Sequence, residues 1–190
     1  SQKVSEFLKV EPGQRIIDAC AGAGGKPLHL AALMQNKGKI LALDTVPRKL
    51  EELRKRASRA GASIVEARAI ESTKTVKRLY ETADRVLLDV PCSGSGVLRR
   101  NPDAKWKIQP EEIEKVKQVQ KDILNSYSKL AKPGGYVVYA TCSIFPSEGE
   151  KQVEEFMKTH ADWELEEEKR YWPDTDECDG FYMARLKRLK

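Results

Sequence analysis

The apolar residues of this chain fall into short runs that alternate with segments of helical periodicity. The runs are typical of strands buried in a sheet. They cover residues 15–20, 39–44, 63–67, 85–88 and 135–139, and residues 163–166 and 181–186 predict a closing pair of strands. Helices are expected over residues 27–35, 47–60, 111–131 and 147–160. This alternation predicts an α/β fold in which helices cover both faces of a mostly parallel sheet.

Local signals mark several boundaries of these elements. Apolar residues recur at intervals of three and four along residues 111–131, which is typical of an amphipathic helix. The Lys-Pro-Gly-Gly segment at residues 132–135 predicts a stop and a turn. Ser147 with Glu150 three residues later predicts a capping box at the next helix. Because no repeat or linker interrupts the pattern, residues 1–190 are expected to form a single catalytic-type domain.

Composition narrows the class of protein. The chain has 190 residues and a net charge of +5, which is compatible with nucleic-acid binding but does not require it. It shows no apolar run of membrane-spanning length and no signal peptide, so we expect a cytoplasmic protein that does not contact membranes. Its 4 cysteines are widely spaced and it has 2 histidines, so we expect free thiols and no metal site.

A glycine-rich loop follows the first expected strand. Residues 21–26 read Ala-Gly-Ala-Gly-Gly-Lys, and Asp44 ends the second strand, where a carboxylate can bond ribose hydroxyls. Pro27 occupies the third glycine position of the dinucleotide fingerprint and lacks an N–H for a pyrophosphate. The loop therefore favours S-adenosylmethionine over NAD. For Asp18, orienting the glycine loop is favoured over contact with the amino-acid part of the cofactor.

Two cysteines follow successive strands. Cys92 lies in Asp-Val-Pro-Cys-Ser-Gly-Ser-Gly at residues 89–96, and Cys142 lies in Ala-Thr-Cys-Ser at residues 140–143. Since functional groups gather at the carboxyl ends of strands in an open α/β sheet, the two thiols are expected to meet in one pocket.

A pair of thiols beside a carboxylate and a methyl donor suits methylation of carbon 5 of cytosine. Carbon 5 is a poor nucleophile until a thiolate adds to carbon 6, and a carboxylate at the N3/N4 edge of the base can hold the ring and assist the addition. Asp89 is the candidate carboxylate. The spacing of residues alone does not say which of Cys92 and Cys142 attacks.

These motifs resemble the catalytic domain of the RNA 5-methylcytosine methyltransferases, the family of the Fmu/Sun-type 16S ribosomal RNA enzymes and their nucleolar relatives. The matching segments are residues 18–26, Asp44, residues 88–96, residues 98–106, residues 140–143 and residues 179–182. The resemblance implies a doubly wound, Rossmann-like class I S-adenosylmethionine-dependent methyltransferase. Its seven-stranded sheet would have the order 3-2-1-4-5-7-6.

The resemblance also implies roles for single residues. Cys142 would be the nucleophile, Cys92 would help release the adduct, Asp89 would bond the cytosine edge, and Lys26 would lie near the reacting base. The implied cofactor-binding residues are Cys20, Ala21, Gly22, Ala23, Gly24, Gly25, Lys26, Asp44 and Asp89. The acidic residue that such enzymes carry near the adenine is missing at residues 68–70, and Glu66 and Glu71 are the alternatives. The N-terminal RNA-recruiting domain is expected to be absent.

The implied substrate is RNA, with ribosomal RNA favoured over transfer RNA, and the implied state is a monomer. The loop after Cys92 contains Arg99, Arg100, Lys105 and Lys107, which are suited to phosphates. Trp106 lies among them, and a core anchor is favoured over stacking on a base. The alternatives are a methyltransferase for DNA or protein, or a module that binds cofactor or RNA without turnover.

Overall fold

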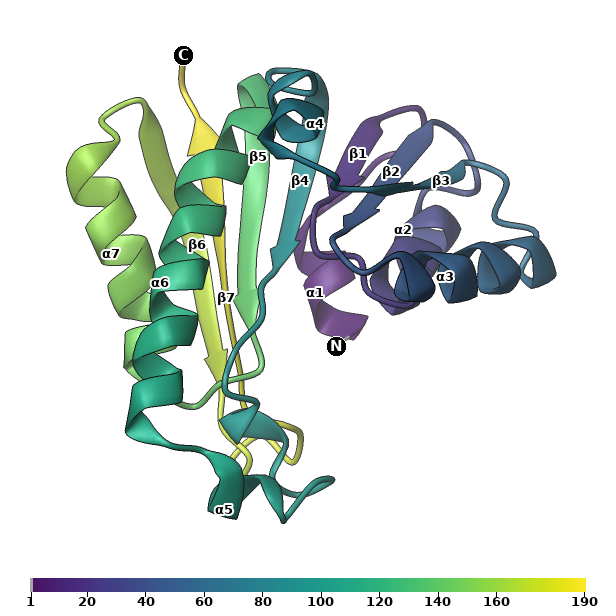
Figure 1. The fold of residues 1–190 in the computed structure, drawn as a ribbon. Helices are drawn as coiled ribbons and strands as arrows, with labels where there is room; N and C mark the ends of the chain where they lie inside the picture. The colour runs from purple at the N-terminus through teal and green to yellow at the C-terminus, as the bar shows by residue number, and fades with distance from the viewer. Residues whose placement is uncertain (1) are drawn as a thin grey trace.

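The computed structural model describes residues 2–190, with the backbone alone for Lys107. Its seven-stranded sheet has the order β3-β2-β1-β4-β5-β7-β6 (Figure 1). Five strands run parallel, and β7 pairs antiparallel with both β5 and β6. The α/β class and the strand order expected from the sequence are both confirmed. The strands are β1 (Arg15–Asp18), β2 (Lys39–Asp44), β3 (Val65–Ala69), β4 (Ala83–Asp89), β5 (Ala131–Thr141), β6 (Trp163–Tyr171) and β7 (Phe181–Arg188).

Helices cover both faces of the sheet. Buried side chains of α1 (Gln2–Phe7), α2 (Gly25–Leu33) and α3 (Pro47–Arg59) pack on one face. Those of α4 (Thr73–Lys77), α6 (Pro110–Tyr127) and α7 (Glu150–Thr159) pack on the other. A four-residue helix, α5 (Ala104–Lys107), projects from the end of the sheet where β4 and β5 finish (Figure 1). Three 3₁₀ turns complete the chain: η1 (Ser95–Val97), η2 (Ser128–Leu130) and η3 (Pro146–Glu148).

The buried pattern along each strand explains the two-sided packing. In β1, Ile16 belongs to the cluster under α1 and α2, whereas Ile17 belongs to the cluster under α6 and α7. In β2, Leu41 and Leu43 face the α6 side while Ile40 and Ala42 face the other. Successive side chains of a strand point to opposite faces of the sheet, and helices cover both faces here. Consecutive residues are therefore both buried and both apolar, which is why the sequence shows continuous apolar runs.

Two expected boundaries are wrong. The helix expected to run to residue 131 ends at Tyr127, because η2 follows and Ala131 already pairs with Ala83 at the start of β5. The Pro-Gly-Gly segment lies inside β5, where the pairing register shifts, so it forms an irregularity within the strand.

The predicted capping box is also wrong. Ser147 lies in η3, and α7 begins after Gly149, which makes no side-chain capping bond. Glu150 turns to Arg170 on β6 instead of returning to the helix start. The short helices α1 and α4 were not expected, since six and five residues show too little periodicity.

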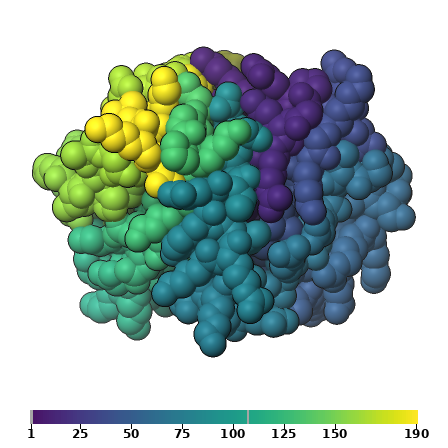
Figure 2. Space-filling model, turned by 90° about the horizontal axis from the view of Figure 1, so that it is seen from above, coloured from purple at the N-terminus to yellow at the C-terminus, as the bar shows by residue number. Residues whose placement is uncertain are grey.

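The two ends of the described chain lie at opposite ends of the sheet (Figure 1). The C-terminal residues lie at the end where the parallel strands begin. There Arg188 donates a hydrogen bond to the carbonyl of Ala131 at 2.7 Å and pairs with Glu81. Figure 2 views this end and shows the yellow C-terminal residues beside green and teal segments. The carboxyl ends of the parallel strands form the opposite end of the sheet, which is where ligand sites lie in open α/β sheets.

Within residues 2–190, no helix combines the length and the apolar character that crossing a bilayer requires. The same residues contain no group of three or more His, Cys, Asp or Glu side chains arranged to hold a metal ion.

Candidate functional site

Cys92 and Cys142 meet at the carboxyl end of the sheet, as the sequence predicted. Asp89 at the end of β4 pairs with Ala140 on β5, so the chain leaves the two strands side by side. The two Sγ atoms lie 3.1 Å apart, and both side chains are half-buried. Both are free thiols.

The two thiols have unequal acidities. The hydrogen bond from the Cys92 thiol lowers the pKa of Cys142, and the Lys26 ammonium acts in the same direction. The hydrogen bond to Cys142 and burial raise the pKa of Cys92 well above its ordinary range. Since the thiolate is the nucleophilic form, this difference favours Cys142 as the candidate nucleophile. Cys20 is a third thiol nearby, and burial raises its pKa, which disfavours its thiolate.

Lys26 and Asp89 form an ion pair beside the thiols. Lys26 is the second residue of α2 and Asp89 is the last residue of β4, so the pair bridges the glycine loop and the Cys92 loop. Both side chains are largely shielded from solvent. All four predicted catalytic residues are thus gathered at one end of the sheet.

The conformation of the glycine loop is fixed by the left-handed backbone of Gly24 and by hydrogen bonds to Asp44. Gly24 adopts φ +93°, and a Cβ atom there would lie 2.7 Å from Leu53 of α3, so no other residue fits. Asp44 accepts hydrogen bonds from the N–H groups of Gly22 at 2.9 Å and Val46 at 2.8 Å. This carboxylate therefore fixes the loop as well as facing the cleft.

Two cavities of about 500 Å³ and about 510 Å³ adjoin at this loop, and both are lined by Cys20, Gly22 and Asp89. The first is also lined by Ala21, Ala23, Gly25 and Lys26, and the second by Asp44. Of the predicted cofactor residues only Gly24 lines neither cavity, because it is buried against α3. We call the two cavities together the cofactor cleft.

Several residues of the cofactor cleft were not predicted from the sequence. Gln2, Ser5 and His29 line the first cavity. The second cavity is closed by one face of α6, at Val119, Ile123 and Tyr127. The helical periodicity of α6 signalled a packed face, but nothing local shows that a cavity lies under it.

The residue at the expected adenine position is Ile70. It follows β3 and lines the second cavity. Glu66 lies outside that cavity, where it pairs with Lys39 at 2.8 Å and with Arg68 at 2.5 Å. Glu71 does not line the cavity either. Neither alternative for the missing acid is therefore placed at the cleft.

Asp18 is fully buried and has two different oxygen environments. Its Oδ1 accepts a hydrogen bond from the N–H of Cys20 at 3.1 Å, which orients the start of the glycine loop as expected. Its Oδ2 has no partner among the described residues, and Asp18 lines the first cavity. Burial, together with the Asp89 charge, raises the pKa of Asp18 to about 7.

The tail motif at residues 179–182 packs on the Cys92 loop. The N–H of Gly96 donates to the carbonyl of Cys142 at 2.9 Å, and the N–H of Gly180 donates to the carbonyl of Gly96 at 2.8 Å. A Cβ atom on Gly96 would lie 2.0 Å from the carbonyl oxygen of Gly180. The loop, the end of β5 and the tail therefore form one tightly packed layer.

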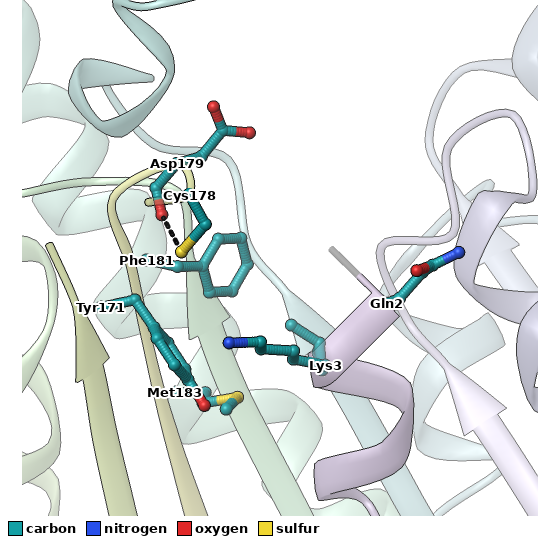
Figure 3. A pocket seen from close by; sticks show the side chains of 8 residues that line it. Gln2, Lys3, Tyr171, Cys178, Asp179, Phe181 and Met183 are labelled. Carbon is teal, nitrogen blue, oxygen red and sulfur yellow. Dashed lines mark hydrogen bonds between the residues drawn. The ribbon is translucent and has the colours of Figure 1, made fainter. Parts of the chain in front are cut away.

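A third cavity, of about 370 Å³, lies between α1 and the β6–β7 hairpin. Figure 3 shows Lys3 extending from α1 toward Tyr171, and its Nζ atom lies 4.1 Å from the centre of that ring. Phe181, Met183 and the half-buried Cys178 complete the wall. This cavity adjoins the cofactor cleft, since Gln2 lines both.

The basic loop after Cys92 is exposed. Arg99 and Lys105 are exposed, and Arg100 pairs with Asp179 at 2.8 Å. The side chain of Lys107 lies outside the described residues. Trp106 is 74% exposed, so the expectation that it anchors the core is wrong. The reason is that α5 is a single turn that projects from the body of the fold, with no apolar surface to cover it.

Comparisons with known proteins agree with this geometry. Residues 5–187 match the family described as 16S rRNA methyltransferase RsmB/F. Over 99% of its length the chain is 36% identical to a probable ribosomal RNA small subunit methyltransferase B of Synechocystis, of which it covers 46%. It is also 36% identical over its full length to the mouse tRNA (cytosine(72)-C(5))-methyltransferase NSUN6, of which it covers 42%. The chain thus spans less than half the length of these curated relatives.

A solved structure extends the comparison to three dimensions. The NSun6 of Pyrococcus horikoshii with SFG, an analogue of S-adenosylmethionine, superposes with a TM-score of 0.90 at 27% identity. That match covers 100% of this chain and 51% of the other.

Proposed function

Because the chain belongs to the 16S rRNA methyltransferase RsmB/F family, we propose that it transfers a methyl group to carbon 5 of a cytosine in RNA through a covalent cysteine adduct. The observation that carries this proposal is the contact of the Cys92 and Cys142 thiols beside the Lys26–Asp89 pair. A methyl transfer to oxygen or to an amine needs no such pair of thiols, whereas carbon 5 of cytosine does need a nucleophile at carbon 6.

The cofactor of this methyltransferase domain is S-adenosylmethionine, which supplies the methyl group when bound. The cofactor cleft fits it in three respects. Its two cavities meet at the glycine loop, its first cavity is lined by Asp18, and its second is lined by Asp44. Asp18 suits an ammonium group, and Asp44 suits ribose hydroxyls.

Ile70, Ile123 and Val119 give the second cavity apolar walls. Such walls suit the adenine ring of the cofactor.

Cys142 is the proposed nucleophile. Its thiolate adds to carbon 6, so a sulfur–carbon bond forms and the electrons of the C5–C6 double bond make carbon 5 nucleophilic. The hydrogen bond from Cys92 and the nearby ammonium of Lys26 favour the thiolate before the base arrives. Asp89 holds the N3/N4 edge of the ring, and Lys26 keeps Asp89 oriented toward it.

Cys92 is proposed to act when the adduct breaks down. After methylation a base must remove the proton from carbon 5, and the electrons then restore the C5–C6 double bond and expel the sulfur of Cys142. Cys92 lies against that sulfur, and the rise in its pKa keeps it protonated. Its thiol can therefore donate a hydrogen bond to the departing thiolate of Cys142 and so assist its release.

The RNA is proposed to enter from the side of the exposed basic loop. Arg99 and Lys105 suit phosphates, and Trp106 offers an exposed ring on which a base can stack. The target cytosine must leave its stack, because carbons 5 and 6 are otherwise out of reach of Cys142.

Ribosomal RNA is the favoured substrate, since the matching family and several relatives bear that name, and transfer RNA is the second candidate through the likeness to NSUN6. The proposed state is a monomer. A ribosomal RNA substrate favours a cytoplasmic location.

The proposal is tested by methyl transfer from labelled S-adenosylmethionine to ribosomal RNA, transfer RNA and DNA, followed by mapping of the modified cytosine. The variant Cys142→Ala is expected to lose activity, by about a thousandfold or more, because carbon 5 is then not activated. The variant Cys92→Ala is expected to accumulate a denaturation-resistant protein–RNA adduct. The matched control is Cys178→Ala, which removes a thiol outside the cofactor cleft and is expected to stay close to the unaltered chain.

Three results would contradict the proposal. Full activity of Cys142→Ala would rule out its role as the nucleophile, and transfer into DNA or protein but not RNA would favour the alternative methyltransferases. Binding of S-adenosylmethionine without any transfer would favour a module that lacks turnover.

A further inference from the structure

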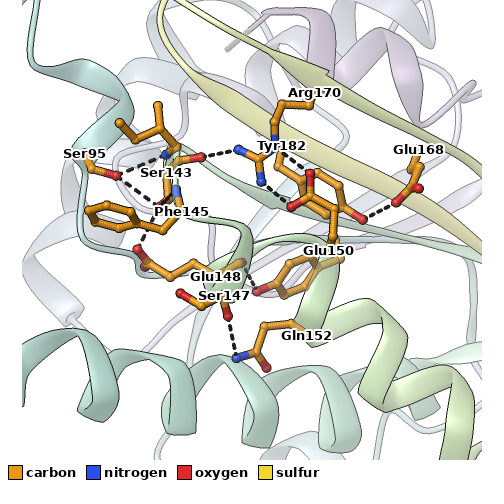
Figure 4. Close-up of polar contacts among 12 residues, drawn as sticks. Ser95, Ser143, Phe145, Ser147, Glu148, Glu150, Gln152, Glu168, Arg170 and Tyr182 are labelled. Atoms are coloured by element: carbon orange, nitrogen blue, oxygen red, sulfur yellow. Dashed lines mark hydrogen bonds and ion pairs between the residues drawn. The ribbon is translucent and has the colours of Figure 1, made fainter. Parts of the chain in front are cut away.

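The carboxylate of Glu148 lies fully buried between the two cysteine loops. It occupies the last position of η3 and has no exposed surface. Its Oε1 accepts a hydrogen bond from the hydroxyl of Ser143 at 2.7 Å (Figure 4). Its Oε2 accepts one from the N–H of Ser93 at 2.8 Å. Ser93 and Ser143 are the residues that directly follow Cys92 and Cys142, so one side chain bonds both cysteine loops.

Gln120 of α6 strengthens this connection. Its Nε2 donates to Oε2 of Glu148 at 2.9 Å and to the carbonyl of Pro91 at 3.0 Å. Cys92 is therefore held on both sides, through Pro91 before it and Ser93 after it. The backbone carbonyl of Glu148 is held as well, since it accepts a hydrogen bond from the hydroxyl of Tyr139 at 2.8 Å.

Burying the carboxylate of Glu148 is not expected to stabilise the fold by itself. A buried carboxylate is costly unless a cation pairs with it. The hydrogen-bond partners of Glu148 in residues 2–190 are neutral groups. The nearest arginine in the same network, Arg170, pairs with Glu150 and donates to the carbonyl of Ser143 instead (Figure 4). A neutral side chain would have a lower desolvation cost at this position. The hydrogen bonds of the carboxylate to both cysteine loops therefore point to a role in positioning them.

We propose that Glu148 is a positioning residue, which sets the spacing of the two thiols by bonding the residue that follows each of them. This inference rests on the proposed roles of Cys142 and Cys92, because the spacing matters only if one thiol acts on the sulfur of the other. The side chain of a glutamate is long enough to reach both cysteine loops. Its negative charge acts in addition, because it adds to the rise in the pKa of Cys92 that the hydrogen bond to Cys142 and burial produce.

Two substitutions separate geometry from charge. Glu148→Gln keeps the length: its amide oxygen can accept from Ser93 and Gln120 while its amide N–H donates to Ser143, whose hydroxyl oxygen can accept. Glu148→Asp keeps the charge but is one methylene shorter, so it cannot reach both loops. The matched control is Glu155→Gln on α7, an exposed glutamate that pairs only with Lys121.

The first readout is the pH profile of iodoacetamide alkylation at Cys92 and Cys142, resolved by mass spectrometry in the protein without RNA or methyl donor. For Glu148→Asp we expect the Cys142 profile to move to higher pH, because the thiols separate and the hydrogen bond from Cys92 is weakened. For Glu148→Gln we expect the Cys142 profile to stay near that of the unaltered chain and the Cys92 profile to move to lower pH.

The second readout is methyl transfer to RNA. We expect Glu148→Asp to lower kcat by about a hundredfold with little change in KM, since misplacement of reacting groups by about 1 Å has effects of that size. Glu148→Gln should restore most of kcat. An unshifted Cys142 profile in folded Glu148→Asp would overturn the inference. A loss of kcat in Glu148→Gln with none in Glu148→Asp would also overturn it, because that result would assign the effect to charge alone.

If Glu148→Asp does not fold, Ser143→Ala removes one of the two loop bonds and decides the question by the same Cys142 profile. The alkylation profiles are independent of methyl transfer. If the unaltered chain methylates no RNA, the proposed function fails, whereas the spacing of the thiols is still decided by the profiles.

Discussion

Asp18 is the buried acid with the most unusual environment in the cofactor cleft. Burial and the neighbouring Asp89 raise its pKa from 3.8 to about 7. Between these values the unfolded chain has released the proton while the folded chain retains it, so the unfolded state is favoured as the pH rises. The stability that Asp18 contributes is therefore fully present below about pH 4 and is lost as the pH approaches 7.

This gives a prediction for the protein without ligand. From pH 5 to pH 7 the free energy of unfolding should fall, with a limiting slope of about 1.4 kcal/mol per pH unit from this residue. Other shifted carboxyls, such as Glu150 and Glu166, have lowered pKa values, so their contributions are complete above about pH 5. Denaturant unfolding of Asp18→Asn across this range should give a flatter profile, and the exposed Asp122→Asn is the control. An identical slope in Asp18→Asn would contradict the assignment.

At the scale of elements, the site is built by three chain segments that meet at the ends of β4, β5 and β7. The Cys92 loop leaves β4, the Cys142 loop leaves β5, and the tail motif enters β7. Their backbones touch through the hydrogen bonds of Gly96 with Cys142 and Gly180. The close approach requires that Gly96 carry no side chain, because a Cβ would lie 2.0 Å from the carbonyl of Gly180.

The substitution Gly96→Ala should therefore push the Cys92 loop away from the tail. We expect a loss of about 1–3 kcal/mol in the free energy of unfolding, the range for overpacking, together with faster alkylation of Cys92. The control is Gly25→Ala in the first turn of α2, where a Cβ meets nothing within 4 Å. Denaturant unfolding measures the first effect and mass spectrometry the second. Unchanged stability in Gly96→Ala would show that the layer can relax around a methyl group.

At the scale of the molecule, the cofactor cleft wraps around the carboxyl edge of the sheet from one face to the other. Its first cavity is lined from α1 and α2, and its second from α6. It lies at β1 and β4, where the strand order reverses, which is the usual place for a ligand in an open α/β sheet. A ligand in the cleft therefore contacts both layers of helices and should stabilise the whole fold.

We predict that S-adenosylhomocysteine raises the unfolding temperature in a concentration-dependent way. At a hundred times its Kd the gain is about 2.7 kcal/mol, which for a chain of this size corresponds to about 5 °C or more. Asp44→Ala should lose most of this shift, because Asp44 both faces the cleft and bonds the N–H of Gly22.

The control is Glu66→Gln, an acid near the start of the neighbouring strand β3 that lies outside the cleft. Scanning fluorimetry measures all three proteins. A full ligand shift in Asp44→Ala would contradict its place in the cleft.

The sequence by itself determined the sheet and most of the catalytic set. Continuous apolar runs mark strands covered on both faces, and the residues that directly follow a strand must lie at its carboxyl end. Cys92, Cys142, Asp89 and the glycine loop were therefore placed at that end by local rules, whereas the place of Lys26 near the reacting base and the strand order came from the family resemblance. The predicted ends of helices and strands were wrong where the backbone of a strand is irregular. The Pro-Gly-Gly segment, which lies inside β5, is the example.

Only the tertiary structure decided how these residues act on one another. The unequal acidity of the two thiols depends on the contact between side chains fifty positions apart in the chain. The role of Glu148 depends on Ser93, Gln120 and Ser143, which approach it from three separate elements. Trp106 is exposed because no other segment of the described chain packs over the single turn of α5. Burial and long-range hydrogen bonds arise from the packing of distant segments, and no local pattern of residues contains them.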